Sequence, residues 1–253
     1  MGRAEGENWH GFRGESALSG RQSGGKPGIC APAPSRAPAD RPRLPGSKQQ
    51  EFHVPNTVPS WLSGALKGTG PGDGRLTVAR LADERTLGRG GFALTSPAFG
   101  DGEALDPCFT ADEEDAVAPP LEWSAPPPGT QELALVVEDA DAGEEPACHW
   151  LVWGLAGQRG KLLEGEVPPR VGKNAHRNSE WLLPEPPPED EAHRYVFQLF
   201  ALDLPLTLMP GASREDLVKT MENHVVAAAV LTGKYKRQPE DAGEGAWDED
   251  DFV

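Results

Sequence analysis

Two aspartates, two histidines and a tyrosine stand at the ends of apolar runs, where polar side chains can line a cleft. Asp139 and Asp141 follow a strongly apolar run, and their spacing points both side chains the same way if the chain stays extended. His149 opens the next apolar run, and His193 and Tyr195 share one face of a later one. The pattern predicts a polar cleft at the edge of a sheet.

These residue types allow several kinds of chemistry. Histidine and aspartate can hold a metal ion, and a carboxyl–imidazole pair can act as acid and base in hydrolysis. Histidines that neighbouring aspartates keep protonated can donate hydrogen bonds to a phosphate group. In a fourth interpretation the side chains only solvate strand ends, with the histidines bonded to backbone carbonyls. Spacing alone leaves all four open.

Nucleophilic catalysis has little support in the sequence. There is no G-x-S-x-G motif and no G-x-x-x-x-G-K-[ST] phosphate loop. Cys148 directly precedes His149, and adjacent residues on a strand face opposite sides, so the two cannot act as nucleophile and base. The other cysteines, Cys30 and Cys108, form no C-x-x-C pair, which argues against a disulfide framework or a zinc site.

Short strands are the elements that would position these residues. Apolar runs separated by turn-forming clusters predict strands at 92–99, 133–137, 149–155 and 193–203. The second run lacks alternation, so both of its faces should be covered. The segments 118–130 and 181–192 are too rich in proline for a strand or a helix.

Two helices are predicted, one before these strands and one after them. In VPSWLSGALKG, Ser60 is the expected N-cap and Gly68 the expected end. Its apolar face suits internal packing or contact with a second copy of the chain. In the last segment, Ser213 is the expected N-cap, and apolar residues at helical spacing lead to a predicted end at Gly233. Those residues are Leu217, Met221, Val225 and Ala228.

The 253 residues are enough for one domain with extensions, and the hydrophobic share of 37% is low for a fully folded chain. We expect a disordered basic tail at 1–55, a short helix and linker at 56–75, a β-rich domain at 76–237 and a disordered acidic tail at 238–253. A targeting peptide at the N-terminus is disfavoured by its three glutamates.

Charge and hydropathy narrow the partners. The net charge is −16, and it comes from the part of the chain after residue 50. Such an acidic body repels phosphate backbones, so we expect no nucleic-acid partner. No apolar run approaches the length of a membrane span, and the N-terminus lacks a secretory apolar core, so we expect a cytoplasmic protein.

An ordered set of motifs resembles the phosphatidylethanolamine-binding proteins, in particular their bacterial Raf-kinase-inhibitor-like branch. The set is D-x-D, HW, P-x-P-P and HRY-x-F, followed by the segment ending in NHVVAAAVLTGKYKR. The resemblance extends from about Leu76 to Arg237. It implies a mostly β fold with short helices, an antiparallel β-sandwich.

The resemblance also implies a small cavity that accepts phosphate-like and carboxylate-like groups. Its expected ligand-binding residues are Asp139, Asp141, His149, Trp181, Pro184, Pro186, Pro187, His193 and Tyr195. The sequence departs from the family pattern in three places. Trp181 replaces a tyrosine, Leu183 replaces a glycine, and Gly143 replaces a proline.

Three functions remain as hypotheses. The first is a non-catalytic protein that binds a small anionic ligand, such as a phosphate or a phospholipid head group, without metal or cofactor. The second is a regulatory protein that inhibits a kinase or a protease through surface contacts. Association into a homodimer stays open under every hypothesis. The third, a hydrolase that uses the histidine and aspartate side chains, ranks last because no nucleophile is evident.

Overall fold

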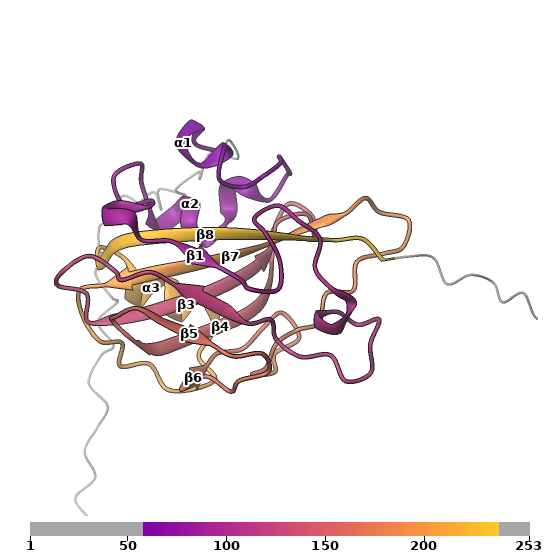
Figure 1. The fold of residues 1–253 in the computed structure, drawn as a ribbon. Helices are drawn as coiled ribbons and strands as arrows, with labels where there is room; N and C mark the ends of the chain where they lie inside the picture. Colours follow the sequence, from indigo (N-terminus) through magenta and orange to yellow (C-terminus); the bar gives the residue numbers. More distant parts are fainter. Residues whose placement is uncertain (1–57, 238–253) are drawn as a thin grey trace, which may run out of the picture. The chain divides into compact units, whose positions relative to one another are not determined.

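The structure, a computed structural model, describes residues 58–237 (Figure 1). The two predicted tails, 1–55 and 238–253, lie outside the described residues. No helix within the described part of the chain is long and apolar enough to cross a membrane.

The strands are β1 Leu94–Thr95, β2 Leu121–Trp123, β3 Glu132–Asp139, β4 Ala147–Ala156, β5 Gly160–Leu162, β6 Arg170–Val171, β7 His193–Leu202 and β8 Val225–Tyr235. The α-helices are α1 Ser60–Ser63, α2 Thr77–Leu81 and α3 Arg214–Met221, with 3-10 turns η1 Asp73–Arg75, η2 Arg89–Gly91 and η3 Pro107–Phe109.

Two antiparallel sheets form the sandwich that the resemblance implies. The larger has the strand order β6-β4-β3-β7-β8, and the smaller has the order β1-β2-β5. Every paired strand within them is antiparallel. The predicted mostly β fold with short helices is therefore confirmed.

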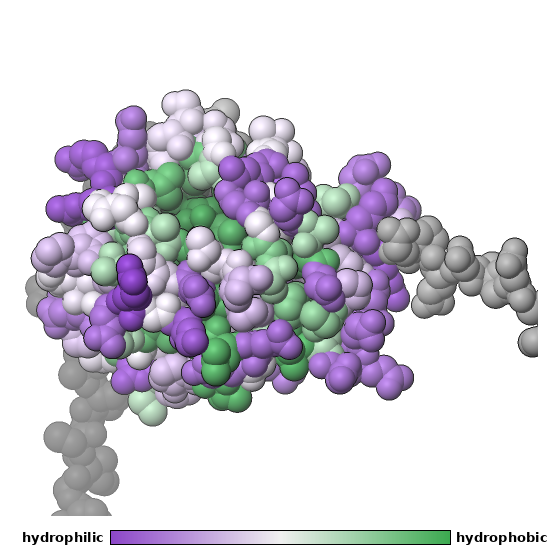
Figure 2. Space-filling model, in the orientation of Figure 1, coloured by the Kyte–Doolittle hydropathy of each residue, from purple (hydrophilic) through white to green (hydrophobic). Residues whose placement is uncertain are grey.

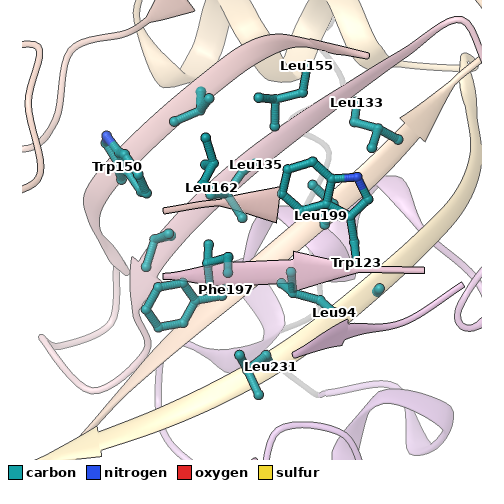
Figure 3. Close-up of a cluster of buried hydrophobic side chains, with 14 of the residues drawn as sticks. Leu94, Trp123, Leu133, Leu135, Trp150, Leu155, Leu162, Phe197, Leu199 and Leu231 are labelled. Carbon is teal, nitrogen blue, oxygen red and sulfur yellow. The ribbon is translucent and has the colours of Figure 1, made fainter. Parts of the chain in front are cut away.

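The hydrophobic core lies between the sheets. Trp123, Leu94 and Leu162 come from the small sheet and meet side chains from β3, β4, β7 and β8 (Figure 3). Alternate residues of β7, such as Phe197 and Leu199, point into this core, while their neighbours point to the other face. Burial on this scale is the main favourable term in folding.

A second apolar layer covers the opposite face of the large sheet. It contains Leu62 and Leu66 from the N-terminal segment, and Leu217 and Met221 from α3. β3 is buried on both faces, as its unbroken apolar run predicts. The segment before Leu76, expected to be a helix and linker, thus packs on the sheet. In the space-filling view, apolar residues reach the surface mainly in the middle of the face turned to the viewer, with hydrophilic residues around them (Figure 2).

The predicted C-terminal helix is wrong in its second half. α3 ends at Met221, and β8 then pairs with β7 along nearly its whole length. Asn223 reverses the chain between them with a positive φ of 67°. The segment VVAAAVL satisfies a helical apolar spacing, but burial on both faces beside β7 favours the extended form. The predicted cap at Ser213 is confirmed, because Ser213 and Asp216 form a capping box.

Other local predictions need smaller corrections. The proline-rich segment 118–130 contains β2, because its prolines flank the strand and leave Leu121–Trp123 free to pair. Only Leu94–Thr95 of the run 92–99 is a strand. The first helix is a single turn that starts after Pro59, without a side-chain cap from Ser60.

Loop segments cover both edges of the large sheet. Ala228 of β8 donates its backbone N–H to Thr86 and accepts from Gly88. Further along, Lys234 bonds in the same way to the 103–105 segment. At the other edge, Gly211 donates to Val171 of β6. These contacts occupy backbone groups that edge strands otherwise leave open.

A buried ionic group joins four elements, α2, β3, β7 and α3, on the helix side of the large sheet. Glu138 of β3 is fully buried and accepts hydrogen bonds from the backbone and side chain of Thr77 and from Gln198. Arg214 of α3 forms an ion pair with the same carboxylate. A buried charge needs such partners, because removing it from water is costly.

Candidate functional site

A cavity of ≈ 1120 Å³ opens where β3 ends and where β4 and β7 begin. Eight of the nine predicted ligand-binding residues line it: Asp139, Asp141, His149, Trp181, Pro186, Pro187, His193 and Tyr195. Pro184 is not among its lining residues. It is buried, and its carbonyl accepts a hydrogen bond from the backbone of Ala111.

A β-bulge directs His149 toward the cavity. Val137 pairs with Trp150 and Glu138 pairs with Cys148, which leaves His149 as the extra residue of β4. Bulges re-aim side chains in this way. His149 and Trp150 therefore both line the cavity, while Cys148 packs in the apolar layer on the other face of the sheet.

His193 lies between two carboxylates. Its Nδ1 is 2.8 Å from Oδ2 of Asp139, and its Nε2 is 3.4 Å from Oδ2 of Asp190. Burial alone would lower the pKa of His193, but the hydrogen bond and charge of Asp139, with help from Asp190, raise this pKa above 6.5. The protonated form carries an N–H on both nitrogens, which suits a site for an anion.

His149 differs from His193, because its pKa is lowered. Burial favours the neutral imidazole, and this effect outweighs the contributions of the Leu182 carbonyl and of Asp139. Nδ1 is 2.7 Å from the carbonyl oxygen of Leu182, which can only accept, so Nδ1 carries the proton. In the neutral ring Nε2 is then a hydrogen-bond acceptor. The interpretation in which neighbouring aspartates favour the protonated imidazole therefore agrees with the direction of the pKa at His193 and disagrees with it at His149.

Asp141 pairs with an arginine and not with a histidine. β3 ends at Asp139, and Asp141 forms a two-pronged contact with Arg194, with Oδ2–Nε at 2.9 Å and Oδ1–Nη2 at 2.7 Å. The same guanidinium binds Asp73 in the N-terminal segment. Asp141 therefore lines the cavity but holds Arg194 in place. Asp139 is the aspartate that orients His193.

The aromatic side chains of the cavity wall are held by contacts within the protein. The indole Nε1 of Trp181 donates to the carbonyl of Phe109 at 3.1 Å, and its ring stacks on Phe197 at 5.9 Å. The only N–H of the Trp181 side chain is thus bonded within the protein. Tyr195 packs edge-on against His149 with ring centroids 5.0 Å apart. Burial and the nearby Asp139 raise the pKa of Tyr195, so its hydroxyl keeps its proton.

The sequence analysis missed the loop between β6 and β7. His176, Asn178 and Glu180 line the cavity. Buried Asn174 organises this loop, because its Oδ1 accepts from the backbone of His176 and its Nδ2 donates to the carbonyl of Glu180. The polar run KNAHRNSE was the available signal, but it lies in no strand.

Acidic side chains outnumber basic ones in the cavity. The lining carboxylates are Asp139, Asp141, Glu166, Glu180, Glu185 and Asp190. The titratable bases of the lining are His149, His176 and His193, and it contains no lysine or arginine. Such a site favours a ligand group of low negative charge over a dianion. Within residues 58–237, no three histidine, cysteine or carboxylate side chains are arranged to hold a metal ion.

Comparisons with known proteins agree with this fold. Residues 95–236 match the family model described as phosphatidylethanolamine-binding protein. A UPF0098 protein of Methanothermobacter thermautotrophicus is 35% identical over 154 residues, which are 57% of this chain and 98% of the relative. A UPF0098 protein of Aquifex aeolicus is 35% identical over 149 residues, 56% of this chain and 86% of that relative.

Solved structures show the same fold. CT736 of Chlamydia trachomatis, described as a phosphatidylethanolamine-binding protein homologue, superposes with a TM-score of 0.55 at 31% identity, covering 58% of this chain and 98% of CT736. YbcL of E. coli, described as a member of the mammalian PEBP family, gives a TM-score of 0.52 at 25% identity, covering 58% of this chain and 99% of YbcL.

Proposed function

The chain belongs to the phosphatidylethanolamine-binding protein family, and from that premise we propose that its cavity binds a small molecule bearing a phosphate or carboxylate group, without catalysing a reaction. The observation that carries the proposal is the imidazole of His193 in the cavity wall, with the carboxylate of Asp139 on its Nδ1. Asp139 fixes the ring through Nδ1 and raises its pKa, so the ring holds its proton more tightly than a free imidazole does.

The two histidines have opposite hydrogen-bonding roles, and these roles determine which ligand group fits between them. His193 donates a hydrogen bond, while the neutral His149 offers Nε2 as an acceptor. A singly charged phosphate, which is a monoester with one proton or inorganic phosphate with two, can accept from the first and donate to the second. Its single charge also suits the acidic lining better than a dianion does.

The apolar part of the cavity suits the rest of such a molecule. Trp150, Val171 and Val117 line it beside the histidines. Contact with these side chains would remove apolar surface from water and add affinity.

The absence of catalysis is proposed from the state of the candidate nucleophiles. The thiol of Cys148 is buried on the opposite face of the sheet, and burial raises its pKa strongly. Tyr195 holds its proton for the same reason. A hydrolase would need one of these groups, or another, to be activated beside the ligand.

Titration calorimetry of the full chain with inorganic phosphate, phosphoethanolamine and sulfate tests the proposal. Phosphate and phosphoethanolamine should bind at pH 6, where a protonated oxygen is abundant. Sulfate, which stays a dianion without a proton, should bind about tenfold or more weakly, because it cannot donate to His149. Absence of binding by both phosphate compounds at pH 6 would refute the proposed ligand class.

A separate assay tests the absence of catalysis. Incubation with model phosphate and carboxylate esters should give no turnover above that of the buffer. Turnover that His149→Ala abolishes would instead support the hydrolase hypothesis.

A further inference from the structure

We propose that Asp190 is a built-in competitor for the ligand: its carboxylate occupies the hydrogen-bond position on Nε2 of His193 that the anionic group must take. The proposal rests on the proposed function, because it concerns the same site. It makes Asp190, which the motif comparison did not single out, a residue that sets the affinity and charge selectivity of the cavity.

The geometry around His193 supports this assignment. Both ring nitrogens of His193 have carboxylate partners, Asp139 on Nδ1 and Asp190 on Nε2. The two carboxylates differ in setting, because the Asp139 side chain is 6% exposed and the Asp190 side chain is 49% exposed. Asp139 is therefore a fixed part of the wall, and Asp190 is a partner that water can replace.

The contact of Asp190 is also the weaker one. Its Oδ2–Nε2 distance of 3.4 Å lies at the long end of the range for hydrogen bonds, against 2.8 Å for Asp139. The backbone of Asp190 is held separately, by a hydrogen bond from its N–H to the carbonyl of Pro187. Rotation of the side chain into solvent would free Nε2 without moving the loop.

Displacement of Asp190 has a consequence for ligand charge. His193 has only two N–H groups, and Asp139 holds one of them, so the incoming anion competes directly with Asp190 for the other. The displaced carboxylate stays near the cavity mouth and repels a second negative charge. The cavity should therefore discriminate between monoanions and dianions less well once Asp190 is removed.

Asp190 also affects the proton on His193. The charged and titratable groups that face this imidazole are Asp139 at the end of β3, Asp141 beyond it, Asp190 in the preceding loop, His149 on β4 and Tyr235, its pairing partner on β8. Loss of Asp190 removes one contribution that raises the pKa of His193, while Asp139 remains. The variant should lose its imidazolium at a lower pH than the wild type.

Calorimetry with inorganic phosphate at constant ionic strength tests the proposal on four full-length proteins: wild type, Asp190→Ala, Asp190→Asn and Glu189→Gln. Glu189 is exposed, does not line the cavity and precedes Asp190 in the same loop, so its variant removes an equal charge without touching His193. At pH 6 we expect both Asp190 variants to bind phosphate about two- to fivefold more tightly than Glu189→Gln. The preference for phosphate over sulfate should shrink in them.

A pH series gives the second readout. The affinity of the Asp190 variants should fall at a lower pH than that of the wild type, so the two curves converge or cross toward pH 8. NMR titration of the His193 ring, without ligand, should give a lower pKa in Asp190→Ala than in Glu189→Gln.

The outcomes separate this proposal from the proposed function. If the wild type binds phosphate and the Asp190 variants bind no more tightly than Glu189→Gln, Asp190 is no competitor, and the proposed function stands. An unchanged pKa of His193 in Asp190→Ala would also contradict the proposal, because it would show that Asp190 does not interact with the His193 ring. If neither the wild type nor any variant binds phosphate, both proposals fall.

Discussion

At the scale of single residues, two histidines in one cavity show how neighbours decide protonation. His193 has a carboxylate on each nitrogen and an elevated pKa, whereas His149 has a carbonyl oxygen on Nδ1 and a lowered pKa. The carbonyl belongs to Leu182, which lies 33 residues further along the chain. The donor and acceptor roles follow from these partners and could not be assigned from the histidines alone.

The first prediction concerns Asp139→Asn. Without the charge on its Nδ1 side, His193 should lose its proton at a lower pH, so phosphate affinity should fall off at a lower pH than in the wild type. Calorimetry between pH 5.5 and 8 measures the shift. Asp203→Asn is a matched control, because Asp203 forms a similar pair with His224 on the surface. Identical pH profiles for wild type and Asp139→Asn would contradict the role of His193.

The second prediction concerns stability against pH. The folded-state pKa of His149 lies below 6.5, so its contribution to stability is present above the unfolded value and is lost as the pH falls. The folded-state pKa of His193 lies above 6.5, so its contribution is full below the unfolded value and is lost as the pH rises.

Urea unfolding at pH 5.5 and 7.5 separates the two contributions. His149→Gln should make the free energy of unfolding fall less on acidification than in the wild type. His193→Gln should make it fall more, while it also weakens phosphate binding. Parallel changes in the two variants would show that one of the two pKa directions is wrong.

At the scale of elements, sequence patterns were informative where burial is regular. The apolar runs predicted β3, β4 and β7, and with them the strand-end positions of Asp139, His149 and His193. The patterns failed where two structures fit one spacing, as in β8, whose alanine-rich run also satisfies a helical period. They also missed the loop residues His176 and Asp190, because loops carry no periodicity that places them beside a strand.

The Glu138–Arg214 pair carries the third prediction. Arg214→Met would leave a buried carboxylate without its cation and should cost about 3–5 kcal/mol of unfolding free energy. The double variant Glu138→Gln/Arg214→Met should recover part of that loss, because no unpaired charge remains. Denaturant unfolding measures both.

Ligand binding serves as the internal control for this pair. Glu138 and Arg214 lie on the face of the sheet opposite the cavity, so phosphate affinity should be unchanged in variants that remain folded. If Arg214→Met is as stable as the wild type, the ion pair contributes nothing to the free energy of unfolding.

At the scale of the whole molecule, the N-terminal segment of the domain is joined to the site. Asp73 shares the Arg194 guanidinium with Asp141, which lines the cavity. Leu62 and Leu66 are fully buried under the large sheet. The change of sequence texture near Leu76 therefore does not mark the start of the packed structure.

The fourth prediction compares two truncations. A chain of residues 55–237 should melt close to the full-length protein, because the composition of the removed segments offers no core. A chain of residues 76–237 should be strongly destabilised, since the loss of each buried leucine contact alone is worth about 2–5 kcal/mol. Differential scanning calorimetry distinguishes them. Equal melting temperatures for the two chains would show that residues 58–75 contribute little.

The covering of β8 bears on how the protein behaves when it is stressed. An uncovered strand of this length would offer a template on which identical chains could add, which is the route to ordered fibrils. Thr86, Gly88 and the 101–105 segment occupy that template through hydrogen bonds to Ala228, Thr232 and Lys234. Resistance to aggregation during heating or refolding therefore depends on how firmly two short loops hold one edge, and is separable from the stability of the sandwich itself.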